Sequence, residues 1–414
     1  MTRRGGAVRR PAPTRDPYGL TSVATYRSPI IATIGLVIAA WLSVGLLTGD
    51  LVIPGASGSN TSNQDPLRTP TPSGVVVVVP PEEPLSGSLL YVKSGNIWIQ
   101  NGDKATQVTS TGHDTMASFS PDGQWIYYIH TDDQINLFPN NGNPRRYEMA
   151  IPYLMRVKAD GSGKPQTLAS GKYRDGRYWF FYWMRQPVIA PNGRTVALLS
   201  DGPNALRSDV VLQFFDVKSR RLSNPQLPET SPLGHQDPTW RPDGKYLLYV
   251  RNGRDGSRGT PVIMRYEPAR NRTTTLSGPG YSTPSYSRNG RYVAATSTDS
   301  FGTDIVILNG GNGSELLRVT NDGRSWAPVW SPKGDAIAFL HLEDSIVDLR
   351  LVHLDGPSGR WTVGKVEDLT QNAGLDSESR PGWFVPADQL PALPSPAGSA
   401  LESSAPGGSS STAH

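Results

Sequence analysis

One segment of the sequence concentrates side chains that could bind a ligand. Residues 171–186 read GKYRDGRYWFFYWMRQ. Aromatic residues beside arginines are typical of the energetic centres of protein interfaces, and aromatic rings also stack on sugar rings. The segment therefore predicts a surface that binds a partner or a glycan, formed by Tyr178, Trp179, Phe181, Trp183, Arg174, Arg177 and Arg185. The alternative is that these rings are buried, for example against the Phe138-Pro139 loop.

A second set of candidate residues lies in connections between predicted strands. Each of these connections comes just before a copy of a repeated motif, which is described below. If the copies form a ring, these connections converge near the mouth of its central channel. We expect a polar funnel there that could hold a peptide terminus or a cation, formed by His113, Asp114, His235, Arg324, Trp326 and Arg380. A solvated rim with capping hydrogen bonds is the alternative.

The sequence lacks the common motifs of catalysis. It contains no Gly-x-Ser-x-Gly elbow, no HExxH zinc motif and no phosphate-binding glycine loop. It also has no cysteine, which excludes thiolate zinc sites and a cysteine nucleophile. His113 with Asp114 is a weak candidate for an acid–base pair. We predict a protein that is not an enzyme and needs no cofactor or metal, with a hydrolase or lyase as the alternative.

The positive charge is confined to one end of the chain. Residues 1–28 hold six arginines and one aspartate, whereas the remaining 386 residues hold 34 basic and 35 acidic side chains. The body of the protein is therefore not built to bind nucleic acid through its bulk charge.

An apolar stretch follows the basic end. Residues 30–47 read IIATIGLVIAAWLSVGLL and contain no charge, and residues 29–48 as a helix match the thickness of a bilayer core. The arginines in front predict a cytoplasmic tail (1–28), a single transmembrane anchor (29–48) and an extracytoplasmic body at the plasma membrane. A cleaved signal peptide is the alternative. Compositions rich in Pro, Gly and Ser predict a linker at 49–86 and a disordered tail at 391–414.

Between these segments, one motif recurs six times. Five full copies are ASFSPDGQWIYYI, PVIAPNGRTVALL, PTWRPDGKYLLYV, PSYSRNGRYVAAT and PVWSPKGDAIAFL, and a truncated copy, PGWFVP, starts at Pro381. Each predicts a short strand, a type I turn and an alternating strand, and two more strands complete each unit. Three strands precede the first full copy, and one follows the last unit. We therefore predict an all-β, six-bladed β-propeller over 87–390, with 3+1 closure of the blade that the two chain ends share.

The repeat Pro-x-Trp-Ser-Pro-x-Gly, as in Pro328–Gly334, resembles the PD40 (WD40-like) repeat of TolB-type six-bladed propellers. The resemblance covers the predicted propeller and implies its fold. It also implies binding of an envelope protein or peptide, because TolB proteins are periplasmic and bind such partners. Residues 49–86 leave no room for the α/β domain that precedes the TolB propeller. We expect a monomeric, membrane-anchored binding module, with a cell-wall glycan binder or a propeller-fold hydrolase or lyase as alternatives.

Overall fold

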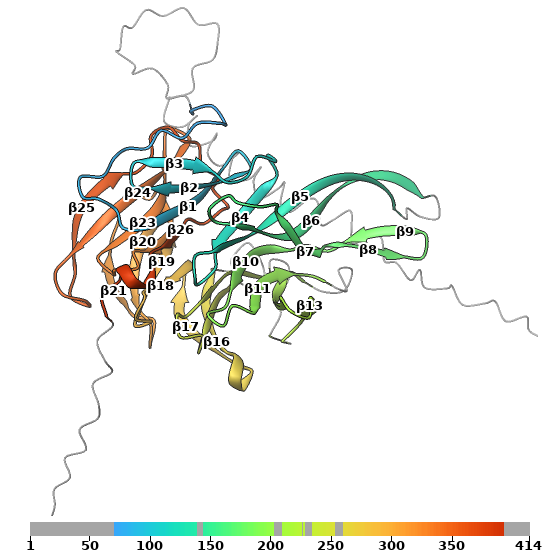
Figure 1. The fold of residues 1–414 in the computed structure, drawn as a ribbon. Helices are drawn as coiled ribbons and strands as arrows, with labels where there is room; N and C mark the ends of the chain where they lie inside the picture. The colour runs from blue at the N-terminus through green and yellow to red at the C-terminus, as the bar shows by residue number, and fades with distance from the viewer. Residues whose placement is uncertain are drawn as a thin grey trace, which may run out of the picture.

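The structure is a computed structural model that describes residues 70–138, 144–202, 209–225, 227, 234–252 and 260–392. These residues form six four-stranded antiparallel sheets, so the predicted all-β, six-bladed propeller is confirmed (Figure 1). The predicted tail at 1–28, the anchor at 29–48 and the chain after residue 392 lie outside the described residues. Among the described residues, no helix is long and apolar enough to cross a membrane.

Each blade runs from an inner strand at the channel to an outer strand. Blade 1 contains β4 (Asp114–Phe119), β5 (Trp125–Phe138), β6 (Arg145–Lys158) and β7 (Gln166–Ser170), and blade 2 contains β10 (Arg185–Ile189), β11 (Thr195–Ser200), β12 (Val211–Asp216) and β13 (Arg221–Ser223). Blade 3 contains β14 (His235–Trp240), β15 (Leu247–Arg251), β16 (Val262–Glu267) and β17 (Arg272–Pro279), and blade 4 contains β18 (Tyr281–Tyr286), β19 (Tyr292–Asp299), β20 (Gly302–Asn309) and β21 (Glu315–Arg318). Blade 5 contains β22 (Ser325–Trp330), β23 (Ala336–Glu343), β24 (Ile346–Asp355) and β25 (Thr362–Asp368).

Blade 6 combines the two ends of the described chain. Its sheet has the order β26 (Gly382–Phe384), β1 (Ser88–Lys93), β2 (Asn96–Asn101) and β3 (Lys104–Gln107). The inner strand β26 pairs antiparallel with β1, and the Phe384 ring lies 5.8 Å from the Phe119 ring of blade 1. Two short 3₁₀ helices, η1 (Pro268–Arg270) and η2 (Ala387–Gln389), complete the described elements outside the blades, together with the hairpin of β8 and β9 described below.

The repeated turns form as their residue types predict. In the first copy, the Ser120 carbonyl accepts the Gly123 N–H at 2.9 Å, and the Ser120 hydroxyl accepts the Trp125 N–H at the same distance. Gly123 adopts a φ of +69°, which favours glycine. The same closing bond recurs in the other four full copies. These turns join the first and second strands of blades 1 to 5 on one side of the ring, called here the turn face.

Six apolar clusters hold the blades together, one between each pair of neighbours. The alternation of each strand sends its two sets of side chains toward opposite neighbouring blades. In blade 1, for example, Tyr128 packs toward blade 6 and Ile129 packs toward blade 2. Blade 6 also packs on blade 5, through Leu89, Tyr91 and Trp98. The core is therefore a closed ring of six interfaces around the channel.

Blade 1 departs from the repeat by carrying an arm. The segments 131–152 and 170–186, which separate strands of the repeat, themselves contain strands. The first is an extension of β5 and β6 into one continuous hairpin, and the second contains the two-stranded sheet of β8 (Lys172–Asp175) and β9 (Tyr178–Phe181). The two hairpins pack together and project from the ring, as Figure 1 shows. We call them the arm.

The end of the predicted linker lies against the ring. The Thr71 and Val79 N–H groups donate to the carbonyls of Asn372 and Leu369, next to blade 5. The Lys93 ammonium, which is buried, donates to the Thr71 and Val75 carbonyls at 2.9 and 2.6 Å. The part of the linker from residue 70 onward is therefore bound to the propeller.

Candidate functional site

The side of the ring opposite the turn face is called here the mouth face. Near this face, the inner strand of each of blades 1 to 5 contains a residue with a strained backbone. Met116, Gln186, Asp237, Thr283 and Ala327 occupy equivalent places in blades 1 to 5, at a bulge near the start of each inner strand. All five have φ between 44° and 54°, a left-handed conformation that is uncommon for residues other than glycine. Backbone strain of this kind is found at sites that the surrounding structure holds in place.

A belt of hydrogen bonds holds these residues. The Asp237 N–H donates to Gln186 Oε1 at 2.8 Å, and the Thr283 N–H donates to Asp237 Oδ2 at 3.1 Å. At the other end of the belt, the Met116 N–H donates to Ser379 Oγ of the chain leading into blade 6, at 2.8 Å. Each backbone donor thus reaches a side chain of a neighbouring blade. The belt fixes the shape of the channel at the mouth face.

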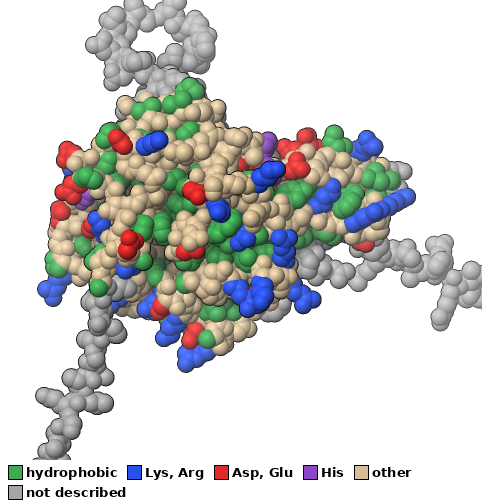
Figure 2. Space-filling view, viewed as in Figure 1, with side chains coloured by type: hydrophobic (Ala, Val, Ile, Leu, Met, Phe, Trp, Pro, Cys, Tyr) green, Lys and Arg blue, Asp and Glu red, His purple; other side chains and the backbone are tan. Residues whose placement is uncertain are grey.

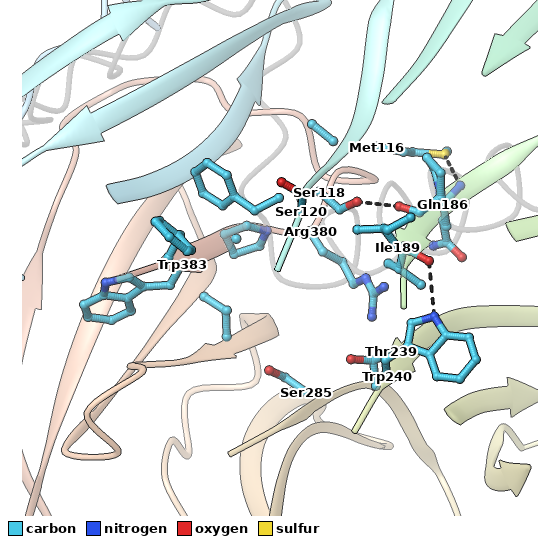
Figure 3. A pocket seen from close by; sticks show the side chains of 18 of the residues that line it. Met116, Ser118, Ser120, Gln186, Ile189, Thr239, Trp240, Ser285, Arg380 and Trp383 are labelled. Atoms are coloured by element: carbon cyan, nitrogen blue, oxygen red, sulfur yellow. Dashed lines mark hydrogen bonds between the residues drawn. The ribbon is translucent and has the colours of Figure 1, made fainter. Parts of the chain in front are cut away.

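Inside the belt lies a cavity of about 460 Å³. Its wall is made by the inner strands of all six blades and extends to Ser120 and Pro121 at the turn face. Prolines, Ile189, Trp240 and Trp383 supply most of the apolar wall, and a few hydroxyl groups supply polar points, among them Ser118 (Figure 3). The wall therefore offers a ligand both apolar contacts and hydrogen-bonding groups.

Arg380 brings a positive charge into this cavity. Its side chain extends from blade 6 across the channel, and its guanidinium donates to the Pro238 carbonyl of blade 3 at 2.7 Å and to the Pro284 carbonyl of blade 4 at 3.4 Å (Figure 3). Burial lowers the pKa of Arg380, and the negative charge of Asp237 opposes that shift. Both contacts use backbone oxygens, so the guanidinium keeps further N–H donors that a carboxylate or amide could accept.

A smaller pocket of about 200 Å³ lies beside the mouth, at the base of the arm. Thr131 and Pro152 of the long hairpin, Trp183 and the pair of Arg185 with Glu378 line it. Arg185 donates to Glu378 at 2.9 Å, and this pair joins blade 2 to the segment that carries Arg380. Met116 and Glu378 line both cavities. The pocket at the arm base and the cavity at the channel mouth are therefore adjacent.

Asp201, at the end of β11, holds the chain at the base of the arm. Its Oδ1 accepts the Trp183 N–H at 2.6 Å. Burial, with a smaller contribution from the nearby charge of Asp209, raises the pKa of Asp201 to about 7, against the hydrogen bond from Trp183. Asp201 therefore changes its protonation near neutral pH, and its carboxyl group is the acceptor that holds the Trp183 backbone.

The predicted aromatic surface is divided by the structure. Trp183 is 40 % exposed in the smaller pocket, and Arg185 lies beside it. Tyr178, Trp179 and Phe181 are half-buried on β9, farther out on the arm, with Arg174 and Arg177 exposed next to them. The neighbouring Phe180 is buried, with its ring 5.3 Å from that of Phe138. The alternative interpretation, in which the rings are buried against Phe138, therefore describes Phe180.

The predicted mouth residues also separate. Arg380 lines the cavity, His113 and Arg324 are exposed at the rim, and Trp326 is half-buried, with its Nε1 donating to the Ser377 carbonyl at 3.1 Å.

Two members of that set point into the blades. His235 is 1 % exposed and its ring packs on Tyr249, with the ring centroids 4.6 Å apart. Asp114 is fully buried, and its carboxylate contacts His130 Nδ1 at 2.7 Å. Asp114 therefore pairs with His130, and its sequence neighbour His113 is not its partner.

Sequence reasoning missed Gln186, Asp237 and Asp201. The first two directly precede the proline of a motif copy, and that position is a weak signal, because its residue type changes from copy to copy. Asp201 follows an ordinary strand, and nothing in the sequence marks it. Among the described residues, no group of three or more His, Asp or Glu side chains could hold a metal ion.

Comparison with known proteins supports the fold. The structure of TolB from Acinetobacter baumannii superimposes with a TM-score of 0.52 at 17% sequence identity, over 73% of this chain and 67% of that chain. A structure described as putative TolB from Agrobacterium tumefaciens has a TM-score of 0.44 at 18% identity, over 70% of this chain and 91% of that one. An oligogalacturonate lyase in complex with manganese has a TM-score of 0.45 at 17% identity, over 66% and 76%.

The chain thus has a six-bladed β-propeller fold that is similar to the fold of TolB. At these identities the similarity establishes the fold and leaves function open. In sequence, an uncharacterized protein of Agrobacterium fabrum is 24% identical over a match that covers 39% of this chain and 60% of that protein. The match therefore spans less than two thirds of the relative's length. No protein-family model matches the chain.

Proposed function

We propose that this propeller is a binding module that captures a protein or peptide at its mouth face. A segment of the ligand enters the channel and reaches Arg380, and the flanking part of the ligand lies on Trp183 at the base of the arm. The observation that carries the proposal is the adjacency of the two cavities, which share Met116 and Glu378, with a guanidinium in the larger cavity and an exposed indole in the smaller one.

The chemistry of the site favours an extended peptide over a compact small molecule. The larger cavity runs through the ring and is walled mainly by prolines and aliphatic side chains. Its wall also carries polar groups, of which the belt residues Gln186 and Asp237 bond to each other. A chain with small apolar side chains and one carboxylate or amide for Arg380 fits such a channel.

The buried His pairs do not favour catalysis. Ser325 Oγ lies 3.1 Å from His341 Nδ1, but Ser325 is fully buried, so a substrate could not reach the hydroxyl. Asp114, the partner of His130, is likewise fully buried. A glycan platform is also disfavoured, because Lys172 covers the Trp179 ring at 4.4 Å and Arg177 covers the Tyr178 ring at 5.0 Å. We therefore propose a non-enzymatic role.

We further propose that the module is monomeric and extracytoplasmic, held at the plasma membrane by the apolar stretch at 29–48, and that its ligand is an envelope protein or peptide. The arginine-rich start and the uncharged stretch in the sequence support this. We also propose that the pairing of β26 with β1 serves as the 3+1 closure of the ring.

Site-specific photo-crosslinking tests the binding face. A photoreactive amino acid replaces Trp183 at the mouth face in the full chain, and the matched control carries it at Lys333, which is exposed on the turn face. We expect a discrete crosslinked protein from position 183 in native membranes, identified by mass spectrometry, and none from position 333. The product should disappear when Arg380→Gln is added, because that change removes the charge in the channel.

Two results would contradict the proposal: equal crosslinking from both faces, or a product at position 183 that is insensitive to Arg380→Gln. Turnover of a peptide or glycan substrate by the purified chain would contradict the non-enzymatic part separately.

A further inference from the structure

The outer end of the arm carries a cluster of arginines without acidic partners. Arg145 and Arg146 begin β6, and Arg174 and Arg177 flank the turn between β8 and β9. All four are exposed, and none forms an ion pair with a carboxylate of the described chain. We call these four residues the arm-tip arginines. Asp175 is the acidic residue of the turn beside them.

The two hairpins end at the same place. Lys172 at the start of β8 donates to Asn136 Oδ1 at 3.0 Å, and farther out the Phe180 ring packs on Phe138. Arg145 pairs with Phe138, and Arg174 follows Tyr173, the partner of Phe180, toward the turn of the short hairpin, so the arginines of both hairpins lie toward the outer end of the arm. The acidic residues of the long hairpin, Asp132, Asp133 and Glu148, lie farther back along it. Figure 2 shows basic side chains marking the outer part of the arm.

Aromatic side chains lie among these arginines. Arg174 and Arg177 stand 5.7 and 5.0 Å from the rings of Trp179 and Tyr178, and both rings are half-buried. Ile135, on the outward side of the long hairpin, is 69 % exposed. Trp and Tyr beside Arg or Lys is the composition of protein surfaces that rest at the headgroup level of a bilayer.

The arm extends beyond the mouth face. His130 of β5 pairs with Asp114, the first residue of the inner strand β4, so the residues after His130 continue past the end of that strand. Eight residues, from Thr131 to Phe138, follow in the same strand. At about 3.3 Å per residue they span about 25 Å.

The chain arriving from the N-terminus reaches the ring on the same side. Lys93 is the last residue of β1. In the turn that follows, the Gly95 carbonyl accepts the N–H of Asp114, the first residue of β4, at 2.8 Å, so this end of β1 lies at the mouth face. The buried ammonium of Lys93 holds Thr71 and Val75 at this place. The segment that follows the predicted anchor is therefore fixed to the mouth face and not to the turn face.

We propose that the outer end of the arm rests on an anionic lipid bilayer, with the arm-tip arginines bound to lipid phosphates. This inference rests on the proposed membrane anchor. The arm then acts as a spacer between the ring and the lipid, which leaves room for a peptide ligand to enter the channel. Charge complementarity and the attachment of the incoming chain to this face favour a bilayer over a soluble polyanion as the occupant.

Lipid-quenching fluorescence tests the contact in the full chain. The sequence has no cysteine, so Asp175→Cys at the arm tip and Lys333→Cys on the turn face each provide a single labelling site. Each labelled chain is reconstituted in vesicles of phosphatidylcholine, with or without phosphatidylglycerol and with brominated acyl chains as the quencher. We expect quenching at position 175 that requires phosphatidylglycerol, and none at position 333.

Charge variants identify the groups responsible. Arg174→Gln with Arg177→Gln should remove most of the lipid-dependent quenching, because each arginine at an anionic surface contributes roughly fivefold to the association. Arg220→Gln with Arg221→Gln, two exposed arginines between β12 and β13 on the turn face, is the matched control and should change nothing.

The outcomes separate this inference from the proposed anchor. A chain that is released from vesicles by alkaline carbonate lacks the anchor, and the proposed localisation then fails. A chain that is retained but shows no quenching at position 175, or equal quenching on phosphatidylcholine alone, overturns the arm contact while the anchor stands. A label at position 175 that responds to soluble poly(glycerol phosphate) but not to the anionic bilayer also overturns it.

Discussion

Around the channel, the turn face repeats one design in five blades, whereas the mouth face differs from blade to blade. On the turn face, glycines of positive φ close turns with the same hydrogen bond. On the mouth face, the connections range from short turns to the arm of blade 1. The strained belt residues differ in type as well, from Met116 to Asp237. The comparison indicates that the turn face serves to build the ring and the mouth face serves to present a site.

The two faces also differ in what their side chains do. The mouth face bears the indole of Trp183, the pair of Arg185 with Glu378 and the cation of Arg380. The repeated turns bury their hydroxyl groups in local bonds, as Ser120 does with Trp125. Changes on the turn face should therefore lower stability, and changes on the mouth face should alter ligand binding first.

The largest effect is expected where the chain ends meet. A chain that stops at Arg380 lacks β26, which leaves β1 as an open edge and removes the contacts of Trp383 and Phe384. We expect a loss of stability greater than the roughly 3–5 kcal/mol of one buried aromatic residue, and association through the open edge. Thermal unfolding and light scattering measure both effects. A chain that stops at residue 392 is the control, and equal behaviour of the two chains would contradict the closed ring.

A smaller effect is expected from Gly123→Ala on the turn face. The φ of Gly123 is +69°, and an added Cβ would lie 2.2 Å from the Phe384 ring of blade 6. We expect destabilisation of about 3 kcal/mol, from backbone strain together with displacement of the ring. Gly334→Ala is the control. Gly334 occupies the same turn position in blade 5 with a φ of +86°, but an added Cβ would have no atom within 4 Å. Chemical denaturation should therefore show a cost of only about 1 kcal/mol for Gly334→Ala.

The smallest effect is expected from Asp201, which joins the arm base to blade 2. Its folded pKa of about 7 lies above the ordinary value of 3.8, so the folded state binds this proton more tightly than the unfolded state. Its contribution to stability therefore falls as pH rises from about 4 to 7, with a difference of about 2 kcal/mol between pH 5 and pH 8. Asp201→Asn mimics the protonated acid and should lose this part of the pH dependence in denaturation curves. An unchanged pH profile in the variant would show that Asp201 titrates normally.

Much of the ring could be predicted from the sequence because its signals are local. A Ser-Pro-Asp-Gly turn and an alternating strand depend on neighbouring residues, so each copy predicts its own hairpin, as in the turn from Ser120 to Gly123. The three strands predicted before the first full copy are present as β1, β2 and β3. The arm was harder to predict from the sequence. A strand that continues beyond its sheet contains polar residues, such as Gln134 and Asn136, and so has the composition of a long loop.

The sequence by itself determined the number of blades, the place of the tight turns and the concentration of aromatic and basic residues in one segment, since each is a property of residue type and spacing. Only the tertiary structure decided that Arg380 crosses the channel, that Asp114 pairs with His130, and that Trp183 rather than His235 lies exposed at the mouth. The physical reason is that the direction of a side chain in a ring depends on bulges and on contacts between blades far apart in sequence. Contacts between blades maintain the strained backbone at Gln186 and Asp237, and no local sequence pattern predicts such contacts.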